Sequence, residues 1–172
     1  MTGFESKHEV KDSLRLGERL QLAEAAGGIG SFEFDPASRQ WSWSPQVAAL
    51  FGVDQHAASA NFEESLRSVF VDDAPKIRAA LEAAKESGTF YVEFRVRHAD
   101  GRLRWLAGKG QIAAQGGSGQ VLRGTFYAID ERKQLEAKLL AVNETLEARV
   151  GELREEARTL EESHRHSHRR RT

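Results

Sequence analysis

Hydrophobic and polar residues alternate most regularly between residues 89 and 98. One set of alternate positions is hydrophobic: Phe90, Val92, Phe94 and Val96. Since neighbouring side chains of a strand point to opposite faces, this segment predicts a strand with one buried face. Asp100-Gly101 follows, and this dipeptide suits the positive φ angles of a tight two-residue hairpin turn. Residues 102–114 then form the predicted returning strand.

Further strands and short helices complete the central part of the chain. Residues 29–35, 39–44 and 120–129 are short runs bounded by turn residues and predict three more strands. Three helical segments lie between the second and third strands, and they are residues 45–52, 62–70 and 74–88. Antiparallel hairpins around a helical insert place the fold in the α+β class, with no parallel doubly wound sheet.

The N-terminal part differs from this domain. Residues 1–12 are polar, and we expect them to be flexible. Residues 13–28 predict an amphipathic helix, because Leu16, Leu20 and Ala23 share one stripe and a Gly pair ends the pattern. That stripe needs an apolar surface, either on its own domain or on a partner. The expected organisation is therefore a flexible start, this helix, a domain over 29–130, a helix over 131–163 and a basic His/Arg tail over 164–172.

Residues 131–163 carry a heptad pattern, with Leu139, Leu146, Leu153 and Leu160 recurring every seven residues. With Leu at position d, position a holds Glu136, Asn143, Val150 and Ala157. The other phasing pairs the same Leu with Leu135, Val142, Arg149 and Glu156. We favour the first phasing, since its seam holds one charge and a single Asn at position a can set register. The predicted seam is Leu139, Asn143, Leu146, Val150, Leu153 and Leu160. A single long helix lying on its own domain remains the alternative.

Composition narrows the possible partners and chemistry. The chain has 172 residues, a formal net charge of −1 and no Cys. Such a balance gives no reason to expect binding to nucleic acid or to an anionic membrane. The first residues lack the apolar run of a signal peptide, and no run of about 18 apolar residues predicts a membrane span. We therefore expect a cytoplasmic protein without disulfides or thiolate metal sites.

Three separated segments together resemble the PAS domain family. They are "GGIGSFEFDPASRQWSWSPQVAALFGV", "FYVEFRVRHADGRLRWLAGKGQ" and "LRGTFYAIDERKQLEAKL". The resemblance covers about residues 15–133 and is greatest to the subgroup with a Trp in the second hairpin strand. It implies a five-stranded antiparallel sheet with helices across one face, and a sensing or dimerising role. Such domains are usually attached to a histidine kinase, a cyclic-dinucleotide enzyme or a transcription factor.

The resemblance also identifies a junction between the last strand and the long helix. The family commonly has Asp-Ile-Thr before Glu-Arg-Lys, where this chain has Ala128, Ile129 and Asp130, with Arg132 just beyond. The first Asp of the family pattern anchors the junction by pairing with a nearby base, which Ala128 cannot do. Asp130 can still cap the following helix, because its carboxylate accepts N–H groups and its charge suits a helix N-terminus.

A ligand pocket between sheet and helices is a further expectation. Its candidate residues are Phe34, Leu50, Phe51, Ile77, Leu81, Phe94, Trp105 and Phe126. The alternative, which we favour, is that these side chains simply fill the core. No cofactor is predicted, although a small ligand is possible. Flavin–thiol photochemistry is excluded because there is no Cys. Haem is not expected, because helix 74–88 has no His to serve as the axial ligand that the resemblance implies.

No catalytic set of residues stands out, so we expect no enzyme activity and no metal site. In the tail, His164 and His168 would share a helical face and predict at most weak metal binding, and a solvated end is the simpler interpretation. The sequence therefore predicts a homodimeric sensor module that signals through its C-terminal coiled coil to an effector such as a histidine kinase. The alternatives are a PAS scaffold with a filled core and a fragment of a kinase that lacks its catalytic domain.

Overall fold

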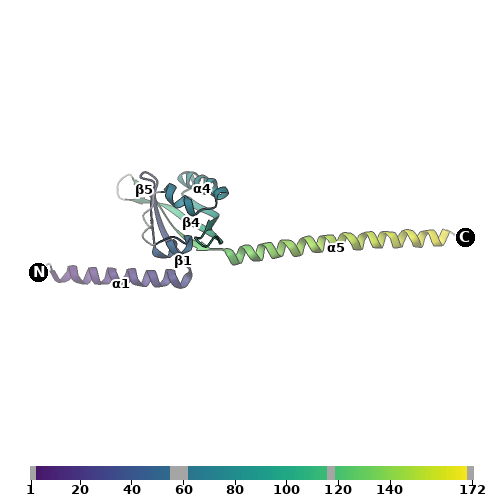
Figure 1. The fold of residues 1–172 in the computed structure, drawn as a ribbon, viewed down its shortest axis with the longest axis horizontal. Helices are drawn as coiled ribbons and strands as arrows, with labels where there is room; N and C mark the ends of the chain where they lie inside the picture. The colour runs from purple at the N-terminus through teal and green to yellow at the C-terminus, as the bar shows by residue number, and fades with distance from the viewer. Residues whose placement is uncertain (1–2, 55–61, 116–118, 170–172) are drawn as a thin grey trace. The chain divides into compact units, whose positions relative to one another are not determined.

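The computed structural model describes residues 3–54, 62–115 and 119–169, which fall into two compact units (Figure 1). The first unit runs from residue 1 to 130 and the second from residue 131 to 172. The first contains the sheet and most of the helices. The second consists of a single long helix.

An antiparallel sheet of five strands organises the first unit. Its strands are β1 (Ile29–Asp35), β2 (Gln40–Trp43), β3 (Thr89–Arg97), β4 (Leu103–Gln115) and β5 (Gly119–Ala128). They lie in the order β2-β1-β5-β4-β3, and every neighbouring pair is antiparallel. The predicted α+β class and the five-stranded sheet are confirmed.

The helical elements occupy the predicted places, but the helix predicted over 62–70 is shorter, because α-helix ends at Ser65, a 3-10 turn follows, and Val69 forms a β-bridge with Val96. They are α1 (Gly3–Gly27), α2 (Pro45–Phe51), α3 (Phe62–Ser65), α4 (Ala74–Ser87) and α5 (Asp130–Arg169), with short 3-10 turns η2 (Leu66–Ser68) and η3 (Val71–Asp73). Helix α1 begins at Gly3 and so includes most of the segment 1–12 that the sequence analysis expected to be flexible. Residues 4–12 include neither Pro nor Gly, the two residue types that most strongly disfavour a helix.

The turn between β3 and β4 is longer than the predicted two-residue hairpin. The N–H of Gly101 donates to the carbonyl of His98 at 2.9 Å, and the N–H of His98 donates to the carbonyl of Arg102 at 2.9 Å. Gly101 has a φ of 83°, while Asp100 stays at negative φ. Instead of adopting positive φ, Asp100 accepts the backbone N–H of Arg102 on its carboxylate at 3.0 Å. A type I turn followed by a left-handed Gly results.

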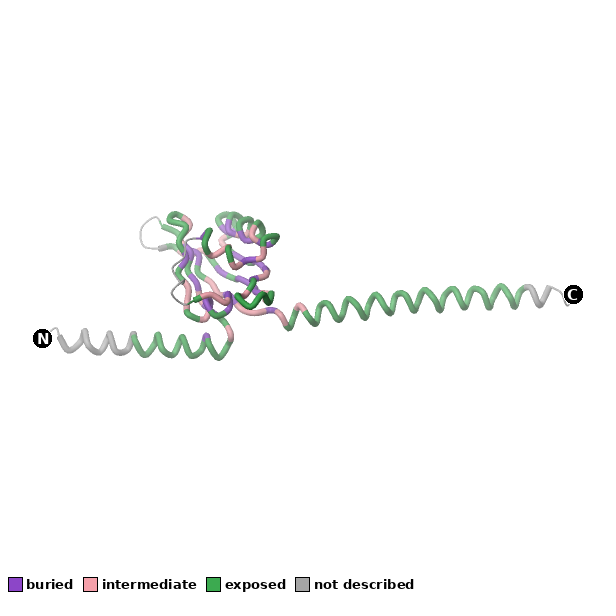
Figure 2. The backbone as a smooth tube through the Cα atoms, viewed as in Figure 1, coloured by how far each residue is buried: buried purple, intermediate pink, exposed green. Residues whose placement is uncertain are grey.

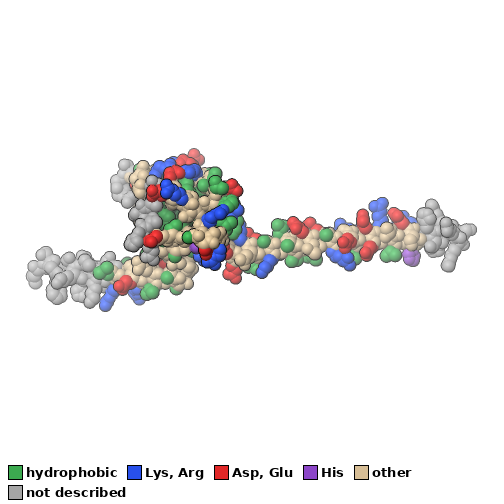
Figure 3. All heavy atoms as spheres, viewed as in Figure 1, with side chains coloured by type: hydrophobic (Ala, Val, Ile, Leu, Met, Phe, Trp, Pro, Cys, Tyr) green, Lys and Arg blue, Asp and Glu red, His purple; other side chains and the backbone are tan. Residues whose placement is uncertain are grey.

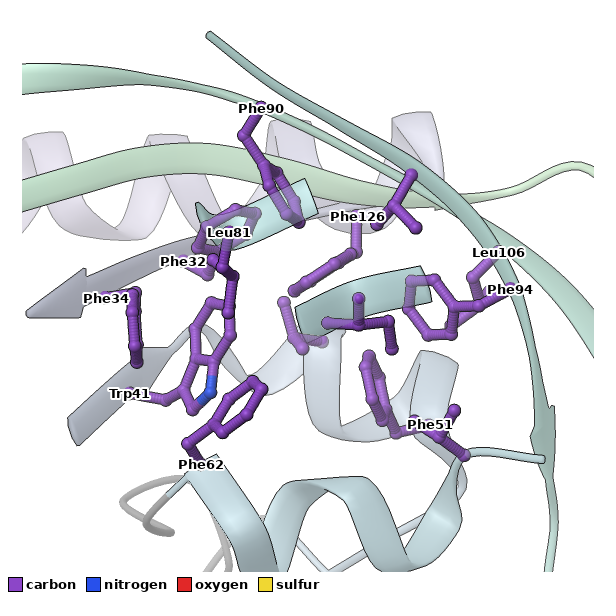
Figure 4. Packing of buried hydrophobic residues seen from close by; sticks show 14 of the residues in the cluster. Phe32, Phe34, Trp41, Phe51, Phe62, Leu81, Phe90, Phe94, Leu106 and Phe126 are labelled. Carbon is purple, nitrogen blue, oxygen red and sulfur yellow. The ribbon is translucent and has the colours of Figure 1, made fainter. Parts of the chain in front are cut away.

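The hydrophobic core lies between one face of the sheet and the helices that cover it (Figure 4). Strand β3 contributes one face to this core, because every second side chain along it is buried. Opposite these side chains, the inner face of β4 and β5 carries Gly108 and Gly124. A Cβ on Gly108 would lie 2.6 Å from the ring of Phe126, so the ring occupies the space that a side chain would need.

Helix α5 is exposed over nearly its whole length (Figure 2). Ion pairs one turn apart support it, such as Arg132–Glu136 at 2.6 Å and Arg149–Glu152 at 2.7 Å. Hydrophobic side chains recur between acidic and basic ones along its visible face (Figure 3). Among the described residues, no helix is both long enough and apolar enough to span a membrane.

Candidate functional site

A small cavity lies inside the core, and we call it the tryptophan cavity. Its lining comprises Trp41, Trp43, Phe51, Phe62, Ser65, Leu66, Val69, Ile77, Phe94 and Phe126. Its volume is about 20 Å³, which on this scale holds about one water molecule. The walls are aromatic and aliphatic, with Phe51 in edge contact with Phe126 at 5.4 Å between ring centroids.

Four of the eight predicted pocket residues line this cavity: Phe51, Ile77, Phe94 and Phe126. Phe34, Leu50 and Leu81 are buried in the same core but do not line the cavity. They pack the layer around it. Seven of the eight predicted residues therefore belong to the core, and four of these line the cavity.

Trp105 corrects the prediction. It pairs with Arg95 across the β3–β4 ladder, while Phe94 pairs with Leu106. Because paired residues share a face and neighbours alternate, Trp105 lies on the face of the sheet that points away from the core. There the guanidinium of Arg95 lies 5.2 Å from the centroid of its ring. The sequence prediction failed because one residue of register decides which face a strand residue joins.

Trp41 and Trp43 are the residues that the sequence analysis missed. They sit two positions apart on β2, opposite Phe34 and Phe32 of β1. Both Nε1 atoms are buried, and neither meets a hydrogen-bond acceptor among the described residues. Figure 4 shows the indole nitrogen of Trp41 on the side of the ring toward Phe62. The spacing Trp-x-Trp in a predicted strand was the available signal, since it places both indoles on one face.

A largely buried ion pair joins α4 to β3, the edge strand of the sheet. Asp73 is fully buried at the start of α4, and its carboxylate accepts Nε of Arg95 at 2.7 Å and the backbone N–H of Arg95 at 3.0 Å. Lys76 donates to the other oxygen at 2.7 Å. The hydrogen bonds from Arg95, followed by that from Lys76, hold the pKa of Asp73 well below its ordinary value of 3.8, although burial opposes them. The charged pair therefore locks α4 onto β3.

The strand–helix junction is held by the backbone of Trp105. Its N–H donates to the carboxylate of Asp130 at 2.8 Å, and its carbonyl accepts the N–H of Ile129 at 2.9 Å. The other oxygen of Asp130 accepts Nε of Arg104 at 3.3 Å. The sequence analysis expected Asp130 to cap the helix, but its two oxygens contact β4. Asp130 thus makes the pairing with a base that Ala128 cannot make.

Within the described part of α5, ion pairs such as Arg149–Glu152 join residues of the same helix. Arg132 pairs with Glu136, and every residue of the predicted seam is exposed, namely Leu139, Asn143, Leu146, Val150, Leu153 and Leu160. Leu135 and Val142, which belong to the other phasing, are exposed to a similar degree at 59% and 55%. Burial within the chain therefore does not choose between the two phasings.

Two of the six histidines, His98 and His164, have side chains within the described part of the chain. His98 is half-buried, and its Nε2 lies 3.0 Å from the carbonyl oxygen of Leu50, so it joins the hairpin to α2. His164 is exposed on α5. His56 lies outside the described residues, as do the side chains of His166 and His168. The prediction of weak metal binding there stays a prediction.

Comparison with known proteins adds a family and several relatives. A family model described as PAS fold matches residues 40–126. The chain is 29% identical over 125 residues to the sensor protein FixL of Bradyrhizobium diazoefficiens, a match that covers 72% of this chain and 25% of that protein. It is 27% identical over 143 residues to the probable diguanylate cyclase DgcE of Escherichia coli, covering 83% of this chain and 13% of that protein. The chain thus spans a quarter or less of these relatives.

Solved structures show the same fold. A crystal structure of a sensory box histidine kinase/response regulator from Burkholderia thailandensis is similar with a TM-score of 0.60 and 27% identity, covering 74% of this chain and 97% of that chain. The N-terminal domain of a diguanylate cyclase with a PAS/PAC sensor from Marinobacter aquaeolei has a TM-score of 0.54 at 18% identity, covering 61% of this chain and 98% of that chain. The second likeness concerns the fold alone.

Proposed function

Because the chain belongs to the PAS fold family, we propose that it is a signal-input module that homodimerises through α5 and passes a signal along that helix to an effector. The observation that carries this proposal is the position of the exposed apolar stripe. The stripe follows directly on Asp130, the residue whose carboxylate is bonded to β4. An effector such as a histidine kinase or a diguanylate cyclase is supported by the names of similar proteins, a sensory box histidine kinase/response regulator and a probable diguanylate cyclase.

Pairing of two α5 helices is favoured by the hydrophobic effect. Leu139, Leu146, Leu153 and Leu160 are each at least half exposed in the single chain. Full burial of one Leu side chain contributes roughly 1.5–3 kcal/mol. Four such residues from each chain therefore provide a driving force that can exceed the entropy lost on association.

Signal transmission follows from the contacts at the junction. A ligand or partner that prefers one arrangement of the sheet would shift the population toward it, but only if its affinity differs between the two arrangements. Movement of β4 at Trp105 would then act on Asp130 and Ile129 through two hydrogen bonds. In a dimer, a displaced helix start changes the relative rotation of the two α5 helices. The proposal includes no catalytic step, and we expect no phosphorylation on incubation with labelled ATP.

The mass in solution tests the dimer. At tens of micromolar, light scattering coupled to gel filtration is expected to give twice the 19.2 kDa of one chain. A chain that ends at Lys133 lacks the stripe and is expected to be monomeric. A monomeric full-length chain would contradict the proposal. A dimer that persists after the truncation would place the contact within residues 1–133 instead.

The small size of the cavity favours a second candidate, a dimerising scaffold that senses nothing. A volume of about 20 Å³ leaves room for little more than a water molecule. Native mass spectrometry of the purified protein separates the two candidates. A retained small molecule supports the sensor, whereas an interior that takes up no ligand supports the scaffold.

A further inference from the structure

We propose that a hollow beside the strand–helix junction binds a phosphate monoester, and that Arg102 and Arg104 hold its phosphoryl oxygens. The hollow is lined by His98, Arg102, Leu103, Arg104 and Asp130, and we call it the junction hollow. None of these residues lines the tryptophan cavity inside the core. The inference rests on the sensor function proposed above, because it gives that module a ligand site next to the start of α5.

The junction hollow is large enough for a small molecule and has a fixed wall. Its volume is about 320 Å³, at the lower end of the roughly 300–1,000 Å³ of small-molecule sites. The wall is His98, whose Nε2 lies 3.0 Å from the carbonyl oxygen of Leu50. The imidazole also fills the space beside Gly52, where a Cβ would lie 2.6 Å from the ring. This wall is therefore held in place before any ligand binds.

Two guanidinium groups supply the donors. Arg102 and Arg104 are two positions apart at the start of β4, and alternate residues of an extended chain point to the same side. Nε of Arg102 donates to Asp100 at 2.7 Å, and Nε of Arg104 donates to Asp130 at 3.3 Å. Among the described residues, none accepts a hydrogen bond from the terminal amino groups of these two Arg. Four amino groups are thus available to a ligand in the hollow.

The charge and shape of these donors match a phosphoryl group. The lining holds two Arg and one Asp, so its positive charges outnumber its negative one and attract an anion. A guanidinium presents its N–H groups as a planar fork that binds two oxygens of one phosphate. A terminal phosphoryl group offers three oxygens to two such forks, whereas a carboxylate offers only two. Since the hollow is larger than a phosphoryl group, the matching ligand is a monoester whose organic part fills the remaining space.

The same hollow contains the carboxylate that anchors α5. One oxygen of Asp130 accepts the N–H of Trp105 at 2.8 Å, and the other accepts Nε of Arg104 at the longer distance of 3.3 Å. Both side chains of the longer contact are partly exposed, at 42% for Arg104 and 34% for Asp130. A phosphoryl group bound to Arg104 competes with Asp130 for this guanidinium and repels its negative charge. Binding of the ligand is therefore expected to weaken the anchor of α5 on β4.

Nuclear magnetic resonance of the isotope-labelled full-length chain tests this binding. Phenyl phosphate is the monoester probe, and benzyl alcohol, which has the ring without the phosphoryl group, is the matched neutral probe. Sodium chloride keeps the ionic strength constant, because salt screens a general attraction between charges. We expect phenyl phosphate to shift the Nε–H signals of Arg102 and Arg104 saturably, and benzyl alcohol to leave them in place. A phosphoserine peptide carries the same group, and its affinity relative to phenyl phosphate distinguishes a partner protein from a small molecule as the source.

Three substitutions make the test specific to the hollow. Arg102→Gln removes one of the two forks and is expected to weaken phenyl phosphate binding at least about tenfold, as for the loss of hydrogen bonds to a charged group. The side chain of Arg102 is 83% exposed, so the fold tolerates this change. Arg97→Gln is the matched control, because it removes the same charge from the same hairpin at a position that does not line the hollow. Asp130→Asn removes the competing charge and is expected to tighten binding about fivefold.

Several results would overturn the proposal. They are the absence of a saturable shift, an equal response to benzyl alcohol, and an Arg97→Gln variant that weakens binding as much as Arg102→Gln does. An Asp130→Asn variant that binds phenyl phosphate no more tightly than wild type would refute competition at the junction. The mass of the same samples separates this proposal from the proposed dimerisation. A dimer that binds no phenyl phosphate refutes only the ligand site, whereas a monomer that binds it refutes only the dimer.

Discussion

The backbone N–H of Trp105, on strand β4, donates a hydrogen bond of 2.8 Å to the carboxylate of Asp130, the first residue of α5. The carbonyl of Trp105 accepts the N–H of Ile129 at 2.9 Å, so the last strand and the helix start are both bonded to a single residue. Asp130 therefore makes the contact with a base that the family resemblance assigns to position 128, where this chain has Ala.

Asp130→Ala tests this anchor. The change removes the acceptor for Trp105 and the partner of Arg104, and we expect the free energy of unfolding to fall by about 1 kcal/mol. Amide hydrogen exchange at Trp105 should become faster. Arg104→Gln is the matched control, because it removes the ion pair but leaves the backbone hydrogen bond, so its effect should be smaller. An unchanged melting temperature for Asp130→Ala would show that the anchor contributes nothing.

Asp73→Asn tests the buried ion pair at the sheet edge. It leaves Arg95 and Lys76 without their negative partner, and we expect a loss of about 3 kcal/mol at pH 7, measured by chemical denaturation. Glu82→Gln is the control, because its pair with Lys85 is exposed on both sides and its loss should have no measurable effect. Equal stability of the two variants would contradict a structural role for Asp73.

The same pair predicts a dependence of stability on pH. Hydrogen bonds from Arg95 lower the pKa of Asp73 below its ordinary value of 3.8. A carboxyl whose pKa is lower in the folded chain stabilises the fold above its unfolded pKa and loses that contribution as the pH falls below it. The stability difference between wild type and Asp73→Asn should therefore be constant near neutral pH and shrink as the pH falls below about 4. A difference that grows on acidification would have the wrong sign.

Two Val residues of α5 distinguish the heptad phasings. If Leu146 occupies position d, Val150 lies in the seam and Val142 beside it. Val150→Glu should then weaken the dimer at least about tenfold, and more than Val142→Glu does, as measured by sedimentation. Ala148→Glu introduces the same charge away from either seam and should have little effect. The reverse order for the two Val variants would establish the phasing with Leu135 and Val142.

Gly124 and Gly151 form a matched pair of predictions. A Cβ on Gly124 would collide with the carbonyl oxygen of Lys109 and with the ring of Phe32, so Gly124→Ala should destabilise the sheet by about 3 kcal/mol. Gly151 lies in α5 with no neighbour near its missing Cβ, and Gly151→Ala should stabilise the helix by up to about 1 kcal/mol. Thermal unfolding of both variants measures the difference. A tolerated Gly124→Ala would mean that the β4–β5 approach can relax.

The strands could be predicted because their signal is local. The alternation from Phe90 to Val96 and the start of the long helix near Asp130 depend on neighbouring residues, and both elements lie close to where they were predicted. The extent of α1 and the turn at Asp100 were missed for a related reason. Weak propensities set the start of a helix, and an Asp in a turn can bond the backbone two residues on, as Asp100 does with Arg102, in place of adopting positive φ.

The sequence by itself determined the class of the fold, the order of its elements and the apolar stripe of α5, because all three follow from the spacing of residues along one chain. Only the tertiary structure decided that Trp105 faces away from the core while Trp41 and Trp43 face a cavity, and that Asp130 binds β4. Those outcomes depend on strand register and on which distant groups meet, and a shift of one residue would reverse them. The free energy that selects one register is summed over the whole packed core, so no single segment contains it.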